Sequence, residues 1–284
     1  MWMDPLITDE IRARFDRIKI NDLGFGYDPF GLNKEVMLRA YAVMQPIYEK
    51  YFRVESFGIE NLPASGRCIL AANHTGGIPI DGAMIGLDIL NRMDSPRLMR
   101  AVVDHFVGGM PFFGLFVARV GQVIGTRRNF EYLLNENEMV TVFPEGSKGI
   151  VKPYTERYRC RKWNIGFMEL HLLHKAPLIP VAVVGAEEQM PILQENKWIG
   201  KPLSVPEVPI TLNTLLSLVL GPGMALPFPT KYRIYYGEPI EFYKDFSPST
   251  VRSPEMIREL ANEVKDRVQR MIVKGLAERE GIFY

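Results

Sequence analysis

Short apolar runs alternate along this chain with longer stretches in which apolar residues recur every three or four positions. The short runs predict strands over 53–57, 68–72, 98–103, 122–124, 140–143, 178–184 and 232–236. The stretches between them predict helices over 82–91, 130–135 and 163–174. Such alternation is typical of an α/β domain with a mostly parallel sheet flanked by helices on both faces. Functional residues are therefore expected just beyond the ends of strands.

Two longer helical patterns lie near the ends of the chain. Asn33 is a suitable N-cap for an amphipathic helix over 34–51, which Pro46 should kink and whose apolar face can lie on lipid or on the protein core. A charged amphipathic helix over 254–280 should pack on the sheet. The polar first 33 residues predict no continuous structure. We expect an N-terminal segment, 1–52, followed by an α/β domain over 53–284.

The segment 208–230 is unusual because it holds 23 residues without a charge, enough to cross a bilayer as a helix. Four prolines interrupt it, and its unbroken apolar part covers only nine residues. We interpret it as an apolar loop that enters a membrane interface, with Lys197, Lys201 and Lys231 placed to meet lipid head groups. A buried loop or a short core helix is the alternative.

Composition narrows the class of protein without naming a partner. The chain has 284 residues, of which 47% are hydrophobic and 24% charged, as in an ordinary globular protein. A formal net charge of +1 gives no overall attraction to nucleic acid, and no nucleic-acid partner is expected. Two cysteines and an N-terminus without an apolar leader make the cytoplasm the default location.

The common catalytic templates do not occur in this sequence. It contains no G-x-S-x-G turn, no phosphate-binding glycine loop of the nucleotide enzymes and no Cys-x-x-Cys pair. His171 and His174 stand at helical spacing, but no third ligand lies at a recognisable distance. We therefore expect neither a metal nor a resident cofactor.

The loop after strand 68–72 carries the first candidate chemistry. It begins with Asn73 and His74, passes through two glycines and ends at Asp81, where a helix starts. A neutral imidazole can take a proton from a hydroxyl group while a carboxylate holds its other ring N–H. Asp81 is also a natural N-cap and His74 can bind loop backbone, so a structural interpretation stays open.

A second block, Phe-Pro-Glu-Gly-Ser-Lys over 143–148, follows strand 140–143. Backbone amides near Gly146 and Gly149, together with Lys148, can receive a phosphate or a carboxylate, although a plain strand-to-helix turn explains the same residues. The six basic residues between 148 and 162 can meet CoA phosphates, a carrier protein or anionic lipid, or form a solvated face. They are Lys148, Lys152, Arg157, Arg159, Arg161 and Lys162.

With these blocks in this order, the chain resembles the lysophospholipid acyltransferase superfamily, the group of 1-acylglycerol-3-phosphate acyltransferases. The resemblance covers about 52–242 and uses His74 to Asp81, Gly121 to Arg127, the block 143–148 and an apolar run over 178–182. Two features depart from the family pattern. Six residues instead of four separate His74 from Asp81, as in the diacylglycerol acyltransferase-like and transmembrane branch, and Lys148 replaces the usual Arg.

The resemblance implies direct acyl transfer. His74 would deprotonate an acceptor hydroxyl, which attacks the thioester of acyl-CoA or acyl carrier protein, while Asp81 orients His74. Arg127 and Lys148 would contact acceptor phosphate. The implied substrate-binding residues are Arg127, Glu145, Gly146, Ser147 and Lys148. The acyl thioester is a donor substrate, and no cofactor or metal is implied.

We therefore expect a membrane-associated O-acyltransferase, peripheral or monotopic on the cytoplasmic face of a membrane, whose acceptor is a lysophosphatidate-like lipid. The lengthened loop and Lys148 keep a second hypothesis open, in which the acceptor is a non-phosphorylated alcohol such as diacylglycerol or a long-chain alcohol. The altered spacing between His74 and Asp81 keeps open a third hypothesis, a non-catalytic lipid-binding protein.

Overall fold

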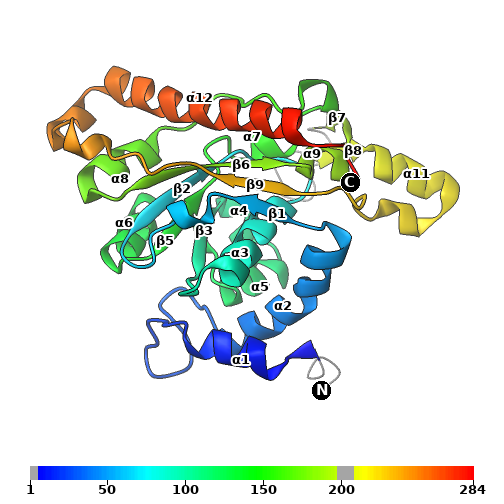
Figure 1. Ribbon diagram of the computed structural model, residues 1–284, viewed down its shortest axis with the longest axis horizontal. Helices are drawn as coiled ribbons and strands as arrows, with labels where there is room; N and C mark the ends of the chain where they lie inside the picture. Colours follow the sequence, from blue (N-terminus) through cyan, green and yellow to red (C-terminus); the bar gives the residue numbers. More distant parts are fainter. Residues whose placement is uncertain (1–5, 197–207) are drawn as a thin grey trace.

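The computed structural model describes residues 6–196 and 208–284, and in this part of the chain seven strands form the main sheet in the order β1-β9-β6-β2-β5-β3-β4 (Figure 1). The strands are β1 (Glu55–Phe57), β2 (Cys68–Ala72), β3 (Met99–Val103), β4 (Val123–Ile124), β5 (Met139–Val142), β6 (Leu178–Val184) and β9 (Arg233–Tyr236). From β6 to β4 all neighbours are parallel, whereas β9 is antiparallel to β6 and β1 runs with β9. The predicted mostly parallel sheet is confirmed.

Helices cover both faces of this sheet (Figure 1). One face carries α1 (Asp9–Asp16), α2 (Lys34–Pro46) and α3 (Ile80–Arg92), and the other carries α6 (Arg127–Asn135), α8 (Gly166–His174) and α12 (Pro254–Glu278). Side chains of β2 alternate between the two hydrophobic clusters: Leu70 lies under α1 to α3, and Ile69 lies under α6, α8 and α12. The loops after the parallel strands therefore meet at one edge, where ligands bind in α/β folds.

Shorter elements complete the described chain. The short α-helices are α4 (His105–Gly108), α5 (Phe113–Arg119), α7 (Ser147–Ile150), α9 (Ala186–Gln189) and α11 (Leu212–Leu220). Single turns of other helix types are η2 (Ile47–Tyr51), η3 (Ile59–Asn61), η4 (Tyr154–Glu156), η6 (Pro222–Ala225), η7 (Phe242–Lys244) and η8 (Pro248–Arg252). The predicted strands and longer helices all occur, with ends that shift by three residues at most.

The helix predicted over 34–51 forms with the expected start and bend. Asn33 Oδ1 accepts a hydrogen bond from the amide of Val36 at 3.0 Å, which confirms the N-cap. Pro46 is the last α-helical residue, and the next five residues widen into a π-helix turn. Proline has no N–H to continue the α-helical pattern, so the change occurs there. Leu38 and Tyr41 are buried in the hydrophobic cluster of the sheet, so the apolar face of α2 lies on the protein core.

The structure adds a helix that the polar pattern of the first 33 residues does not predict. Thr8 caps α1 by accepting a hydrogen bond from the amide of Ile11 at 3.3 Å, and Phe15 is buried in the cluster of the sheet. The loop after α1 is tied to β3 by a buried ion pair of 2.6 Å between Asp28 and Arg100. The N-terminal residues thus share one hydrophobic cluster with the α/β domain.

The uncharged segment 208–230 is not a single loop, which corrects our interpretation. Val208–Thr211 forms strand β8, which pairs antiparallel with β7 (Ile192–Asn196) outside the main sheet. Leu212–Leu220 then forms helix α11, because Thr211 caps it through the amide of Thr214 at 3.1 Å and nine residues pass without a proline. The helix ends at Gly221, whose φ of 104° is readily adopted by glycine.

The far end of α11 carries the most exposed apolar side chains of this segment. Leu218, Val219 and Leu220 are 79%, 81% and 67% exposed, and the helix projects beyond the body of the molecule (Figure 1). Within 6–196 and 208–284, the helices are too short or too polar to cross a membrane. Of the three lysines expected at lipid head groups, Lys197 and Lys201 lie outside the described residues, and Lys231 is paired with Glu55 at 2.6 Å.

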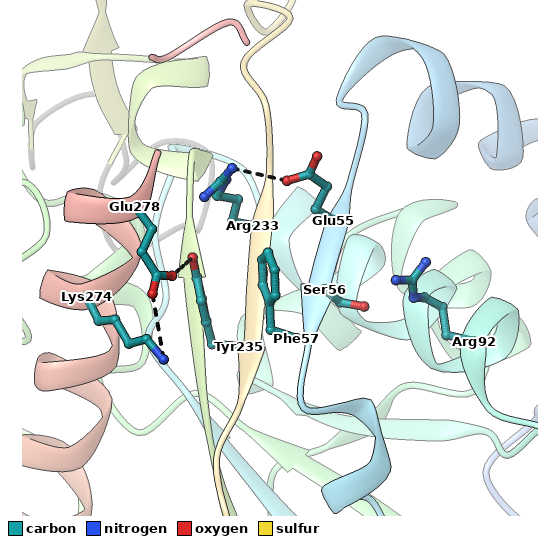
Figure 2. A pocket seen from close by; sticks show the side chains of 8 residues that line it. All are labelled: Glu55, Ser56, Phe57, Arg92, Arg233, Tyr235, Lys274 and Glu278. Carbon is teal, nitrogen blue, oxygen red and sulfur yellow. Dashed lines mark hydrogen bonds and ion pairs between the residues drawn. The ribbon is translucent and has the colours of Figure 1, made fainter. Parts of the chain in front are cut away.

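Two cavities lie away from the loops after the parallel strands. The larger, of about 570 Å³, is bordered by β1, β9, α3 and α12, and several of its polar groups pair with one another (Figure 2). Arg233 binds Glu55 at 3.2 Å, and Tyr235 donates to Glu278 at 3.1 Å. The second, of about 540 Å³, lies between α1, α2 and the end of α3. Neither cavity is lined by a residue of the loop that begins at His74.

Candidate active site

The structure brings together the two residues that the first block proposes as a catalytic pair. His74 follows β2 and Asp81 lies in the first turn of α3, and His74 Nδ1 lies 2.8 Å from Asp81 Oδ2. The carboxylate is buried and fixed by backbone donors: the amide of Thr75 donates to Oδ2 at 3.0 Å and the amide of Gly82 donates to Oδ1 at 2.8 Å. Asp81 can therefore hold the Nδ1 proton of a neutral imidazole and leave Nε2 to accept another.

Two glycines allow the lengthened loop to bring His74 and Asp81 together. Gly76 and Gly77 adopt φ values of 92° and 76°, which side chains rarely permit. The amide of Gly77 donates to the carbonyl of Ile150 at 3.1 Å, which fixes the middle of the loop on α7. The two extra residues and Pro79 are thus accommodated before α3, and the carboxylate still reaches the imidazole.

The second block lies directly against the first. The ring of Phe143 stacks on the imidazole of His74, with centroids 4.1 Å apart and planes inclined by 26°. Gly149 of α7 approaches so closely that a Cβ there would lie 2.7 Å from the carbonyl oxygen of His74. The two blocks, 69 residues apart at His74 and Phe143, therefore form one site.

Asn73, the residue before the candidate base, fastens the loop to the neighbouring strand. Its side-chain amide donates to the carbonyl of Val183 at 3.1 Å and its Oδ1 accepts from the amide of Val183 at 2.8 Å. This pair of bonds extends the β2–β6 pairing by one step beyond the strand. The position of His74 is therefore set on both sides, by β6 and by α7.

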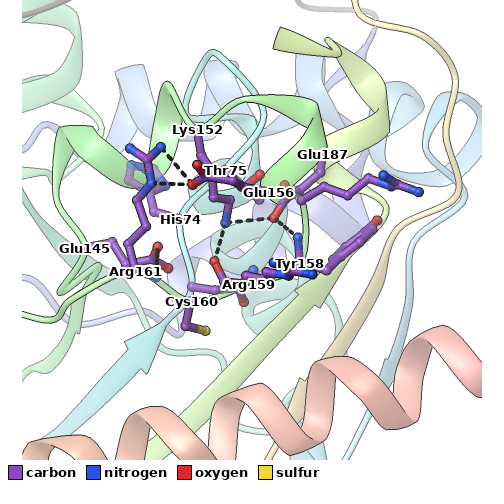
Figure 3. Close-up of polar contacts among 12 residues, drawn as sticks. His74, Thr75, Glu145, Lys152, Glu156, Tyr158, Arg159, Cys160, Arg161 and Glu187 are labelled. Atoms are coloured by element: carbon purple, nitrogen blue, oxygen red, sulfur yellow. Dashed lines mark hydrogen bonds and ion pairs between the residues drawn. The ribbon is translucent and has the colours of Figure 1, made fainter. Parts of the chain in front are cut away.

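Glu145 lies in the same site with one oxygen uncommitted. Its Oε2 accepts a hydrogen bond from the amide of Arg161 at 2.9 Å, while its buried Oε1 finds no hydrogen-bond partner in the described part of the chain (Figure 3). A buried acceptor without a partner is unusual in a folded protein. Gly146 precedes α7 with a φ of 62°, Ser147 starts α7, and Lys148 is exposed.

Arg161, which the sequence interpretation names only as one of six basic residues, lies in this site. Its backbone amide donates to Glu145, and its guanidinium pairs with Glu156 at 3.1 Å (Figure 3). The guanidinium also donates to the carbonyl of Lys148 at 3.0 Å. It thus joins α7 to the loop that follows α7. No local spacing signals this role, because thirteen residues separate Arg161 from Lys148.

Lys152 is not part of a basic surface patch, which corrects that interpretation. Its ammonium group is buried, pairs with Glu187 at 3.0 Å and donates to the carbonyl of Arg159 at 3.0 Å (Figure 3). Burial raises the pKa of Glu187, and the charge of Lys152 opposes that rise. A buried pair of this kind holds the loop 152–159 against α9 and is not available to an anionic ligand.

Arg127, the expected phosphate contact, already has two carboxylate partners. It is the first residue of α6, its side chain is 53% exposed, and it binds Glu169 at 2.6 Å and Glu131 at 2.9 Å. Both partners lie on α6 and α8. In the described part of the chain, Arg127 makes no hydrogen bond to the His74 loop or to the second block.

His171 has a structural environment. Burial lowers its pKa to about 4, so the ring is neutral at neutral pH, and Nδ1 lies 2.7 Å from the carbonyl oxygen of Ala176. Within 6–196 and 208–284, no group of three or more side chains has the arrangement of a metal site. His171 packs against the rings of Phe242 and Tyr243 at the end of α8.

Comparisons with known proteins agree with this geometry. The family model described as Acyltransferase matches residues 53–184, which contain both blocks. An uncharacterized protein of Mycobacterium leprae is 34% identical over 261 residues, covering 92% of this chain and 69% of that protein. A Bos taurus protein described as a DGAT1/2-independent enzyme synthesizing storage lipids is 26% identical over 226 residues, covering 78% of this chain and 59% of that protein.

A solved structure has the same fold. It is the 1-acyl-sn-glycerophosphate (LPA) acyltransferase PlsC from Thermotoga maritima, with a TM-score of 0.54 over 96% of this chain and 89% of that one. The sequences are 16% identical, so this likeness concerns the fold. Together with the family model, these findings show that residues 53–184 of the chain form an acyltransferase domain and that the chain has the fold of PlsC.

Proposed function

We propose that this enzyme transfers a fatty acyl group directly from acyl-CoA or acyl carrier protein to the hydroxyl group of a lipid. The observation that carries the proposal is the 2.8 Å contact between Asp81 and His74 Nδ1. His74 Nε2 takes the hydroxyl proton, and the oxygen attacks the thioester carbonyl. The new ester bond forms, the C–S bond breaks, and the thiolate takes the proton back from His74.

The cysteines support transfer without an acyl-enzyme. Cys68 is buried in β2, and burial raises the pKa of its thiol to about 11. The pKa of Cys160 is raised to about 12, again mainly by burial. A thiol acts as a nucleophile in its ionised form, so neither group is activated at neutral pH.

The acceptor that this site favours is an uncharged lipid alcohol, the second of the two acceptor hypotheses. A lysophosphatidate phosphate would have to displace Glu131 and Glu169 from Arg127, and Lys148 offers a point charge where a guanidinium gives two parallel bonds. The Bos taurus relative is described as synthesizing storage lipids, which agrees with such an acceptor. Diacylglycerol and long-chain alcohols are the acceptors to test first.

An acceptor panel tests this proposal. Release of CoA from palmitoyl-CoA is measured with diacylglycerol, monoacylglycerol, a long-chain alcohol and lysophosphatidate, for wild type, Arg127→Ala and the matched control Arg128→Ala. We expect turnover with neutral acceptors, and both variants within about threefold of wild type, because exposed ion pairs contribute little, about 0–1 kcal/mol. Turnover confined to lysophosphatidate and impaired only in Arg127→Ala would restore the phosphate contact. Absence of turnover with every acceptor would indicate a lipid-binding protein.

We further propose that α11 meets the cytoplasmic face of a membrane. The helix follows strand β8, and its base lies beside the His74 loop, since a Cβ on Gly77 would lie 3.9 Å from Cγ2 of Thr211, the N-cap of α11. Its exposed tip is apolar. A lipid acceptor has to reach that loop from a bilayer. Leu218, Val219 and Leu220 are therefore positioned to enter the interface ahead of the site.

Vesicle flotation tests this contact. The triple change Leu218→Ser, Val219→Ser and Leu220→Ser should lower the fraction of protein bound to vesicles by about tenfold or more, since each buried aliphatic side chain contributes about 1.5–3 kcal/mol. The control is Val273→Ser on α12, where the side chain is 58% exposed. Equal flotation of the triple variant and wild type would exclude α11 as the contact.

A further inference from the structure

One fully buried side chain, Gln189, connects the His74 loop to the base of α11. It is the last residue of α9, the short helix after β6. Its Nε2 donates to the carbonyl of Gly76 at 3.1 Å, two residues beyond His74. Its Oε1 accepts from the hydroxyl of Tyr232 at 2.7 Å, which fixes the orientation of the amide. The side chain thus supports the loop that carries the catalytic pair.

The backbone of the same residue holds both ends of the excursion that contains α11. Its carbonyl oxygen accepts from Asn213 Nδ2 at 3.2 Å, at the start of α11, and from the amide of Phe228 at 2.7 Å, where the chain returns. Asn213 is buried and also donates to the carbonyl of Leu226 at 2.7 Å. Gln189 is therefore the point where the apolar helix is anchored and the His74 loop is supported.

The His74 loop and α9 are closely packed against each other. A Cβ on Gly76 would lie 2.3 Å from Gln189 Nε2 and 2.6 Å from the carbonyl oxygen of Ala186. A Cβ on Gly77 would lie 3.5 Å from Cβ of Met190, the residue after Gln189. Close-packed interfaces transmit displacements instead of absorbing them. A shift of α9 therefore moves the loop, and a shift of α11 moves α9.

We propose that Gln189 is a positioning residue that couples the seating of α11 on a lipid bilayer to the position of the His74 loop, so that acyl transfer is faster at a lipid surface than in solution. A bilayer holds the apolar tip of α11 and restricts the motion of Asn213, which steadies Gln189 and through it Gly76. The bilayer favours the state in which the hydrogen bonds of Asn213, Gln189 and Gly76 are all formed, because only that state combines lipid contact with intact buried hydrogen bonds. The inference rests on the proposed acyl transfer and on the lipid contact of α11.

The test compares one acceptor in two forms. The rate of acyl transfer is measured with a short-chain acceptor dispersed as monomers and with the same head group in neutral phosphatidylcholine vesicles, for wild type, Gln189→Met and Gln189→Glu. Methionine keeps the volume without the amide, and glutamate keeps the acceptor for Tyr232 but loses the donor to Gly76. Ser217→Ala on α11 is the control, because that hydroxyl donates to the carbonyl of Thr214 and makes no hydrogen bond to Gln189 within the described residues.

We expect wild type and Ser217→Ala to have kcat about tenfold or more higher on vesicles, and both Gln189 variants to lose that increase while the KM for the thioester changes less than about twofold. Equal losses in both assays, with the increase on vesicles retained, would make Gln189 merely structural and overturn the proposal. A wild type without any increase on vesicles would overturn it as well.

Hydrogen exchange gives a readout that does not depend on turnover. Amides of residues 74–78 in the wild-type protein should exchange more slowly when neutral vesicles are added, and those of the Gln189 variants should not change. Unchanged exchange in the wild type, under conditions where flotation shows binding, contradicts the coupling. Slower exchange without acyl transfer on any acceptor would leave the coupling supported and reject the proposed reaction.

Discussion

Replacement of His74 with Ala should lower kcat for acyl transfer by about a thousandfold, in the middle of the range for removal of a general base. Without the imidazole, the acceptor hydroxyl has to lose its proton to water, and the thiolate leaves without a proton donor. The KM for the thioester should change less than about threefold, because the proposed role is proton transfer and not donor binding. Steady-state kinetics of thiol release, with a melting curve for each variant, measures both quantities.

His105→Ala is the matched control for this prediction. His105 is exposed at the start of α4, which follows the parallel strand β3. No step of the proposed reaction uses it. Its removal should leave kcat within about twofold of wild type, as for a surface residue away from the chemistry. Turnover by His74→Ala within tenfold of wild type, on the preferred acceptor, would show that another group is the base.

The strands could be predicted from the sequence wherever every residue of the strand is buried. All five residues of β2 and all seven of β6 are buried, so these strands are continuous apolar runs. The hairpin of β7 and β8 has no such pattern, because it lies outside the main sheet and Leu193 is half exposed. The helix α11 was predicted only as an alternative, a short core helix, and most of its apolar side chains are exposed instead.

The site shows the same division between local and distant contacts. His74 and Asp81 stand at the two ends of one loop, so a pair could be proposed from the sequence although their spacing departs from the family pattern. The supports of that loop come from far along the chain: 110 residues separate Asn73 from Val183, and 113 separate Gly76 from Gln189. Arg127 shows the same limit, since Glu169, 42 residues away, pairs with the guanidinium that the resemblance assigns to phosphate. Tertiary pairing of this kind leaves no trace in a local pattern.

Asp81→Asn should lower kcat by about a thousandfold at neutral pH while the protein stays folded. Backbone amides and the imidazole surround the carboxylate with donors: Thr75 and His74 at Oδ2, Gly82 at Oδ1. An asparagine has one oxygen, so its NH2 group must face a donor on one side, at a cost of about 1–3 kcal/mol. When the NH2 group faces His74, Nδ1 becomes the acceptor and the proton moves to Nε2. The ring then presents a proton where the acceptor hydroxyl needs a base.

Asp88→Asn separates this effect from the loss of any buried carboxylate on α3. Asp88 is seven residues further along the same helix, and it accepts from Tyr48 at 2.6 Å and from Tyr236 at 2.8 Å. Burial raises its pKa, and the neutral amide keeps an acceptor for one tyrosine. This variant should melt at a lower temperature with kcat within about threefold of wild type. If both variants lose kcat equally, α3 acts as a whole; if only Asp81→Asn does, the loss arises from the tautomer of His74.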